Sequence, residues 1–218
     1  MDAPVVYVVD DDVPLRQSME QLFRSVSIDF EAYSSADEFL QHFQASRPGC
    51  LILDLRLPGL TGIEFQEQLH SLGIDVPIIF LTGFADVASA VRAMRGGALD
   101  FIQKPHDPTE LLSKVRYAID ISRERIEKTA KDRIIRDCVS ALTAREREVM
   151  ERVVGGRANR EIAEELGVSC KTVEFHRSRV MKKMRADSLA HLVCAAVQIG
   201  LCKMEYPMAH ANGSNGTV

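Results

Sequence analysis

The sequence predicts a doubly wound α/β domain with a five-stranded parallel sheet, followed by a smaller all-helical domain. Over about the first 120 residues, short apolar runs typical of strands covered on both faces alternate with segments of helical periodicity. After that point only helical periodicity remains. The charge changes as well, because residues 1–138 carry 15 Lys and Arg against 22 Asp and Glu, whereas residues 139–218 carry 12 against 9.

The elements of the first domain follow in strict alternation. The expected strands are Val5–Val9, Ile28–Tyr33 (the weakest run), Cys50–Leu53, Val76–Leu81 and Leu99–Ile102. The expected helices are Leu15–Val26, Ala36–Phe43, Ile63–Leu72, Val87–Met94 and Leu111–Ile119. Short connections and right-handed crossovers then favour a parallel sheet with helices on both faces.

Polar side chains stand where the strands end. The first strand runs into Asp10-Asp11-Asp12, and Asp54, Thr82 and Lys104 follow the third, fourth and fifth strands. In doubly wound sheets ligands bind at this edge. The three aspartates alone allow two interpretations: a helix start with Asp12 as the N-cap before Pro14, or a cation site, because clustered carboxylates need a positive partner. The convergence of strand-end residues favours the cation site.

These residue types fit phosphoryl transfer. Carboxylates of Asp11 and Asp54 are the hard ligands that Mg²⁺ prefers. An aspartate such as Asp54 can act as a nucleophile and form an aspartyl phosphate. The Lys104 ammonium and the Thr82 hydroxyl would then neutralise and position the phosphoryl oxygens.

The motifs VVDDD, LDLRLPGLTG, FLTG and DFIQKP resemble, in order and spacing, the receiver domain of two-component response regulators. The resemblance implies a flavodoxin-like fold, phosphorylation at Asp54 by a sensor histidine kinase, and a cis Lys104–Pro105 bond. It implies that Mg²⁺ is bound by Asp11, Asp54 and the backbone carbonyl of Arg56, with Asp10 assisting.

The same resemblance implies a switch made by Thr82 and Phe101, with Lys104 contacting the phosphoryl group. Many relatives have tyrosine where Phe101 stands, so a switch here moves a ring without a hydroxyl. Taken singly, Thr82 is also consistent with a strand-end cap, Phe101 with a core aromatic and Lys104 with a surface lysine.

The second half contains a helix-turn-helix pattern. Thr143 and Glu146 have the spacing of a capping box that starts a helix. After Gly155-Gly156, a short helix at Arg160–Leu166, a turn at residues 167–169 and a longer helix to about Met184 follow. Val173, Val180 and Met184 share the apolar face of the longer helix, and residues 171–185 hold six Lys and Arg against one acid.

From Leu142 to about Gly200 the chain resembles the four-helix DNA-binding domain of the LuxR type, and together with the receiver it resembles FixJ-like regulators of the NarL class. We expect phosphate or base contacts from side chains of the longer helix that point away from the apolar face: Lys171, Thr172, Glu174, Phe175, Arg177, Ser178, Arg179 and Lys182. Many members have lysine where Glu174 stands; a glutamate can accept from cytosine N4 or repel phosphate.

The resulting expectation is a phosphorylation-dependent transcription regulator. It has a receiver at residues 1–122, a helical or alternatively flexible linker at 123–138, a DNA-binding domain at 139–203 and a disordered tail at 204–218. Phosphorylation is expected to produce a homodimer through Val91 and Arg95. The homodimer would then bind promoter DNA and work with RNA polymerase.

A cytoplasmic location is expected, because no apolar stretch reaches the roughly 20 residues of a membrane span and no export signal is visible. The five cysteines are expected to be reduced and mostly structural.

Two other functions fit part of the same pattern. A magnesium phosphatase of the haloacid dehalogenase type also uses a strand-end aspartate, but there the nucleophile lies on the first strand, whereas Asp54 follows the third. A receiver whose second domain binds protein or RNA instead of duplex DNA is the other alternative.

Overall fold

The computed structural model describes residues 3–83 and 86–202 of the 218. The chain divides into two compact units between Lys128 and Thr129. The expected disordered tail, 204–218, lies outside the described residues.

The first unit is built on a five-stranded parallel sheet, as the apolar runs predict. Its strands are β1 (Val5–Val9), β2 (Asp29–Tyr33), β3 (Gly49–Leu53), β6 (Ile78–Thr82) and β7 (Asp100–Gln103). They are arranged in the order β2-β1-β3-β6-β7. Strand order therefore reverses between β1 and β3, which is where ligands bind in this type of sheet.

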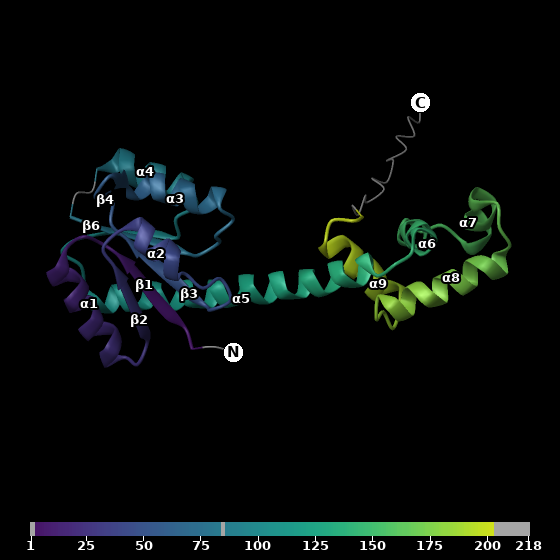
Figure 1. Cartoon of the computed structure of the whole chain (residues 1–218), viewed down its shortest axis with the longest axis horizontal. Coiled ribbons are helices and arrows are strands. Elements are labelled where there is room, and N and C mark those ends of the chain that lie inside the picture. Colours follow the sequence, from purple (N-terminus) through teal and green to yellow (C-terminus); the bar gives the residue numbers. More distant parts are fainter. Residues whose placement is uncertain (1–2, 84–85, 203–218) are drawn as a thin grey trace, which may run out of the picture. The chain divides into compact units, whose positions relative to one another are not determined.

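Helices cover both faces of the sheet (Figure 1). The helices α1 (Val13–Ser25) and α5 (Pro108–Ser140) pack on one face, against side chains such as Val6 and Val8. On the other face lie α2 (Ala36–His42), α3 (Gly62–Ser71) and α4 (Val87–Arg95), which pack against side chains such as Tyr7 and Val9. Successive residues of one strand thus enter two separate cores, which explains why the strands are apolar without alternation.

A two-stranded antiparallel hairpin, β4 (Arg56–Leu57) and β5 (Leu60–Thr61), follows β3 and was not expected. Gly59, at φ +80°, lies in its turn. The hairpin leads directly into α3, where Thr61 and Glu64 form a capping box. It therefore fixes the path of the chain immediately after Asp54.

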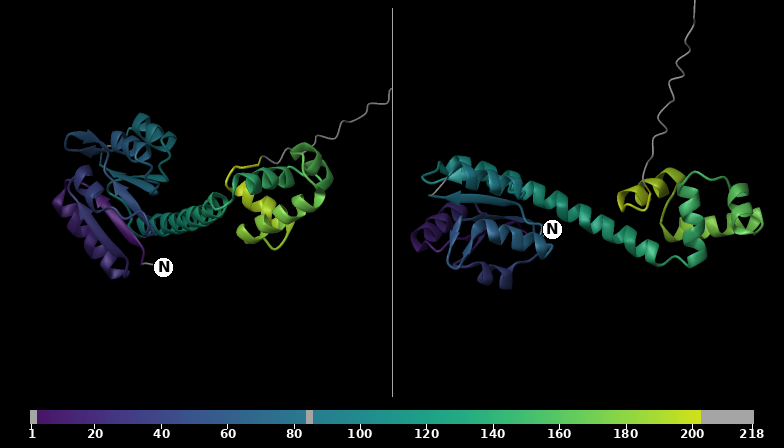
Figure 2. Two further views of the ribbon diagram at one scale, coloured as in Figure 1. Left: turned by 45° about the vertical axis from the view of Figure 1, so that its right-hand side comes forward. Right: turned by 90° about the horizontal axis from the view of Figure 1, so that it is seen from above.

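The second unit is entirely helical among the described residues, as expected (Figure 2, green to yellow). It contains the end of α5, then α6 (Ala144–Val154), α7 (Asn159–Leu166), α8 (Cys170–Lys183) and α9 (Leu189–Gln198). The predicted capping box of Thr143 and Glu146 is confirmed at the start of α6. Gly167, in the left-handed region at φ +64°, ends α7 and makes the turn into α8.

The segment expected as a linker lies inside α5, so it is helical rather than an irregular loop. None of the described helices is both long and apolar enough to span a bilayer.

Candidate functional site

The carboxyl edge of the sheet brings the strand-end residues together. Backbone hydrogen bonds continue the parallel ladder one residue past the strands: Asp10 N donates to Tyr33 O (3.2 Å), Asp54 N to Val9 O (3.1 Å) and Lys104 N to Thr82 O (2.8 Å). Asp10 and Asp54 therefore leave the sheet side by side, and Lys104 follows two residues further along the same edge.

Three carboxylates form the centre of this edge. One oxygen each of Asp10, Asp11 and Asp54 can be chosen so that all three lie within 4.8 Å of one another. Asp10 is buried, Asp54 half-buried and Asp11 exposed. Carboxylate oxygens grouped in this way are a donor set suited to a hard divalent cation.

Lys104 neutralises part of this charge. Its Nζ lies 2.8 Å from Asp10 Oδ2 and 4.0 Å from Asp54 Oδ2. Burial raises the pKa of Asp10 above its usual value, and the neighbouring Asp54 adds to the rise, whereas the hydrogen bond and charge of Lys104 oppose it. The site is therefore electrostatically unfavourable for a further negative charge unless a cation is present.

The loop after β1 separates the three consecutive aspartates into different roles. Asp10 Oδ1 accepts from Asp12 N (2.8 Å), and Arg16 donates from Nη1 to the Asp10 carbonyl. Asp12 instead caps α1, accepting from Leu15 N at 3.2 Å, with Pro14 in the first turn. The helix-start interpretation is therefore confirmed for Asp12, while Asp10 and Asp11 belong to the acidic cluster.

A close backbone approach fixes Asp54 from the other side. Asp54 Oδ1 accepts from Leu55 N (2.7 Å), and Gly62 N donates to Leu55 O (2.8 Å). A Cβ added to Gly62 would lie 2.2 Å from the Asp54 carbonyl oxygen, so this position admits only glycine without a backbone shift.

Thr82 and Phe101 lie on the neighbouring strands. Thr82 is the buried last residue of β6. The half-buried Phe101 pairs in register with Phe80, and their ring centroids are 6.2 Å apart. The Lys104–Pro105 peptide bond is cis, as the resemblance implies.

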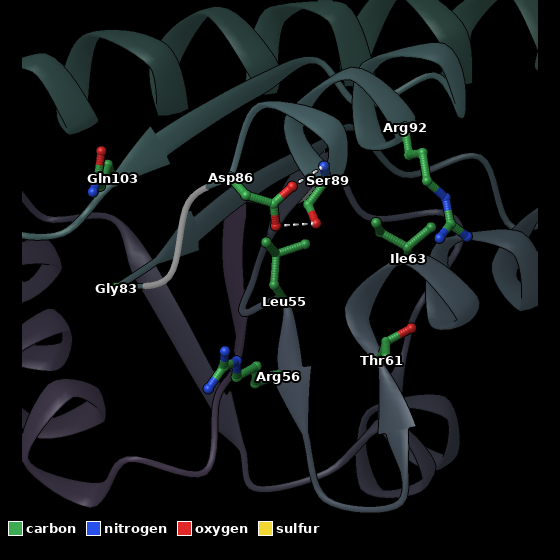
Figure 3. Close-up of a pocket in the computed structure, with 9 residues that line it drawn as sticks. All are labelled: Leu55, Arg56, Thr61, Ile63, Gly83, Asp86, Ser89, Arg92 and Gln103. Atoms are coloured by element: carbon green, nitrogen blue, oxygen red, sulfur yellow. Dashed lines mark hydrogen bonds between the residues drawn. The ribbon is translucent and has the colours of Figure 1, made fainter.

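A pocket of about 510 Å³ adjoins this edge (Figure 3). Leu55 and Arg56 directly follow Asp54, Gly83 follows Thr82 and Gln103 precedes Lys104, so the pocket wall continues the strand-end site. Its remaining lining residues are Thr61, Ile63, Asp86, Ser89 and Arg92.

The far wall of this pocket is the first turn of α4. Asp86 caps α4, accepting from Ser89 N (2.8 Å) and Ser89 Oγ (2.7 Å), as Figure 3 shows. The D-x-x-S spacing could have revealed this cap, which sequence reasoning missed. Beyond it, α4 exposes Val87 (82%), Val91 (42%) and Met94 (46%), and Arg95 is exposed beside them.

In the second unit, α8 presents most of the expected contact residues to solvent. Phe175 is 56% exposed. The other exposed candidates are Lys171, Glu174, Ser178, Arg179 and Lys182. Thr172 is half-buried at the helix start, where its hydroxyl lies 2.8 Å from Ser169 Oγ.

Two arginines of α8 differ from the expectation that they simply point outward. Arg177 is half-buried and donates from Nη1 to Asn159 Oδ1 (2.9 Å), because four-residue spacing from Val173 places it beside the apolar face. Arg179 Nε lies 3.2 Å from Glu146 Oε1. Sequence reasoning missed Glu146 as a partner of α8, since charge pairing between helices leaves no local pattern.

Comparison with known proteins agrees with both units. Residues 6–116 match the response regulator receiver domain, and residues 140–196 match the bacterial regulatory proteins of the luxR family. Nodulation protein W of Bradyrhizobium diazoefficiens is 43% identical over 197 residues, covering 90% of this chain and 87% of that protein. The transcriptional regulatory protein FixJ of Rhizobium meliloti is 39% identical over 197 residues, covering 89% and 96%.

Solved structures give the same result. The response regulator StyR superposes with a TM-score of 0.80 at 37% identity, covering 90% of this chain and 100% of that one. Full-length FixJ from B. japonicum has a TM-score of 0.54 at 35% identity, covering 91% and 98%.

Proposed function

Because the chain belongs to the response regulators, which join a receiver domain to a LuxR-type DNA-binding domain and regulate transcription, we propose that phosphorylation of Asp54 controls its binding to promoter DNA. The observation that carries the proposal is the convergence of Asp10, Asp11, Asp54 and Lys104 at one edge of the sheet. The family regulates transcription and is not a class of catalytic enzyme, which argues against the phosphatase alternative.

The acidic cluster fits Mg²⁺. Asp11, Asp54 and the backbone carbonyl of Arg56 would hold the ion, with Asp10 assisting, and buried Asp10 gains from a nearby positive charge because burial already raises its pKa. When bound, Mg²⁺ neutralises charge on the phosphoryl oxygens.

A sensor histidine kinase would supply the phosphoryl group. An Asp54 carboxylate oxygen forms the new bond to phosphorus while the bond from phosphorus to the donor histidine nitrogen breaks. Lys104 Nζ, 2.8 Å from Asp10 and 4.0 Å from Asp54, needs only a small shift of its flexible side chain to pair with the new phosphoryl oxygens.

The signal would pass from Asp54 to α4. Thr82 ends β6 next to Gly83, which lines the same pocket as the α4 cap Asp86. Movement of Thr82 toward the phosphoryl group would therefore alter the start of α4, and Phe101 would fill the space that Thr82 leaves. Because Phe101 has no hydroxyl, this step depends on packing alone.

Dimerisation is the expected result. Val87, Val91 and Met94 recur at spacings of four and three along α4, which makes an exposed apolar stripe with Arg95 beside it. Two phosphorylated chains would bury this stripe in a homodimer through Val91 and Arg95, and two DNA-binding domains could then engage paired half-sites.

Helix α8 is the proposed reading element. Its exposed lysines, Lys171 and Lys182, would contact phosphates. Phe175 would contact a thymine methyl group, and Glu174 would accept a hydrogen bond from cytosine N4.

We assign residues 1–122 to the receiver, 123–138 to the linker and 139–203 to the DNA-binding domain. The bound promoter would engage RNA polymerase in the cytoplasm.

The test is phosphorylation of the full chain with acetyl phosphate and Mg²⁺, followed by intact mass and duplex binding. We expect Asp54→Asn to gain no phosphoryl group and to show no phosphate-dependent increase in DNA affinity. Asp12→Asn is the matched control, because Asp12 caps α1 and asparagine is an equally good cap. A phosphoryl group that still appears on Asp54→Asn would refute the assignment.

A further inference from the structure

Glu146 is a buried carboxylate that belongs to the DNA-binding unit but not to its exposed surface. It lies in the first turn of α6, and its side chain is 1% exposed. Oε2 accepts from Lys183 Nζ (2.5 Å) and from Thr143 N (2.8 Å). The hydrogen bond from Lys183, followed by that from Thr143, lowers the pKa of Glu146 to about 2, so the carboxylate stays ionised at neutral pH.

Both cations around Glu146 come from α8. Arg179 Nε lies 3.2 Å from Glu146 Oε1, and Lys183, one turn further along, also donates to Ala141 O (3.0 Å). Lys183 is only 29% exposed, whereas the side chain of Arg179 is 55% exposed. One acidic side chain thus attracts two cations of the helix proposed to read DNA: Lys183 through a hydrogen bond, and Arg179 through an ion pair without a hydrogen bond.

Arg179 is fixed on a second side by an aromatic ring. Its guanidinium carbon lies 5.5 Å from the ring centroid of the exposed Phe175, an arrangement typical of a cation–π contact. Glu146, Arg179 and Phe175 therefore form a row that runs from the interior of the unit to its surface. This row limits where the Phe175 ring can lie.

The remaining lysines of α8 have no such restraint. Lys171 and Lys182 are exposed, and neither forms an ion pair with another residue in the described part of the chain. Lys182 is an expected DNA contact and Lys183 is not, and the structure accounts for the difference: Lys182 is solvated, whereas Lys183 is paired with Glu146.

We infer that Glu146 is a positioning residue that withholds Arg179 and Lys183 from DNA phosphates and holds Phe175 in place, and thereby raises sequence selectivity. The inference rests on the proposed DNA binding. Phosphate contacts strengthen binding to every sequence alike, whereas contacts to base edges discriminate. A carboxylate that keeps two cations off the phosphates lowers non-selective affinity while it leaves selective contacts intact.

The test is Glu146→Gln in the full chain. Glutamine can still complete the capping box with Thr143, because that motif accepts Glu or Gln, but it removes the charge that holds the two cations. The probes are a random-sequence duplex and a duplex selected from a random pool by the wild-type chain. Binding to each is measured between about 50 and 200 mM salt.

We expect the variant to bind the random duplex more tightly at low salt and to discriminate less between the two duplexes. Raising the salt over this range should weaken its binding by roughly three- to twelve-fold more than it weakens wild type, as one or two additional phosphate contacts require. A lower melting temperature with an unchanged salt dependence would mean that Glu146 is only structural, and would overturn the inference.

Glu148→Gln is the matched control for charge. Glu148 lies on the same helix and pairs with Arg145 at 2.8 Å, but its side chain is 46% exposed and it forms no ion pair with the described residues of α8. The inference requires its salt dependence to equal that of wild type. An equal change in both variants would show a general effect of net charge and would overturn it.

A second pair of variants applies if Glu146→Gln does not fold. Lys182→Gln should reduce the slope of log affinity against log salt by about 0.9, while Lys183→Gln should leave it unchanged. Equal reductions would overturn the inference. Absence of salt-dependent duplex binding by the wild-type chain would instead refute the proposed function, so the two failures are distinguishable.

Discussion

At the residue scale, neighbouring side chains of the same type have different functions because their surroundings differ. Asp10 is buried and paired with Lys104, Asp11 is exposed at the edge of the acidic cluster, and Asp12 caps a helix. Lys182 and Lys183 differ in the same way. For Asp10 and Lys183 the deciding factor is a distant partner, Lys104 or Glu146, which the local sequence does not contain, whereas the cap at Asp12 is local.

Lys104 is expected to hold the acidic cluster together in the absence of metal. Its removal leaves the buried Asp10 carboxylate without its 2.8 Å partner, so Lys104→Ala should lower the free energy of unfolding by about 2 kcal/mol in metal-free buffer. Mg²⁺ should restore more stability to this variant than to wild type, because the ion supplies the missing positive charge. Urea unfolding with and without Mg²⁺ measures both effects.

Lys114→Ala is a suitable control for Lys104→Ala. Lys114 pairs with Asp100 and Glu110, whose side chains are 33% and 55% exposed, so its loss should cost less and should not respond to Mg²⁺. Equal losses of stability in the two variants would show that Lys104 has no special relation to the cluster.

The depressed pKa of Glu146 predicts a dependence of stability on pH. Its carboxyl group has a folded pKa of about 2 and an ordinary value of 4.5, so its ionised form stabilises the fold above the ordinary value. This contribution should diminish as the pH falls from about 5 toward the folded pKa. Since glutamine does not titrate, the stability advantage of wild type over Glu146→Gln should shrink between about pH 6 and about pH 3 in urea unfolding. A constant difference would contradict the ion pairs seen here.

At the element scale, the sequence predicted the strands well because a parallel strand covered on both faces is a continuous apolar run. β1 agrees at both ends, and β6 begins two residues later than expected. The hairpin β4–β5 was missed because two-residue strands have no periodicity. The end of α5 was left open between a helix and a flexible linker, since charge-rich segments fit both.

The sequence also predicted the strand-end part of the candidate site, but not the contacts between the helices of the second unit. Strand-end residues such as Asp54 and Lys104 are brought together by topology alone, so the expected cluster follows once the sheet is parallel. The positions of Arg177 and Glu146 depend on how α6, α7 and α8 pack, which no single stretch of sequence specifies.

Because helix α5 runs unbroken across the boundary of the two units, we expect trypsin to cut the wild-type chain slowly there. Lys128→Pro removes one helical hydrogen bond and clashes with the preceding turn, at a cost of about 3 kcal/mol to the local helix. Trypsin should then cut rapidly near Arg125 and Lys131 and release two folded units. Lys128→Ala, which removes the same side chain and the same cleavage position, should be cut as slowly as wild type. Equally fast cleavage of wild type would indicate the flexible linker.

At the scale of the whole molecule, the proposed function links chemistry in one unit to DNA binding in the other through association of two chains. In this proposal a single DNA-binding unit engages one half-site, so an increase in affinity on phosphorylation would come from joining two chains. The surface of the receiver that we propose for this contact is the apolar stripe of α4, where Val87, Val91 and Met94 are exposed.

Val91→Asp should therefore prevent dimerisation without preventing phosphorylation of Asp54. A carboxylate in the middle of the stripe cannot be buried without a partner, so dimerisation should be lost while Asp54 still accepts the phosphoryl group from acetyl phosphate. Affinity for a duplex with two half-sites should fall to that for a single half-site. Leu72→Asp is the control, because Leu72 is a comparably exposed apolar residue (56%) that ends α3 and does not belong to α4. Sedimentation of the phosphorylated chains decides the matter: a Val91→Asp dimer as stable as wild type would exclude α4 as the contact, even if Asp54 is the phosphoacceptor.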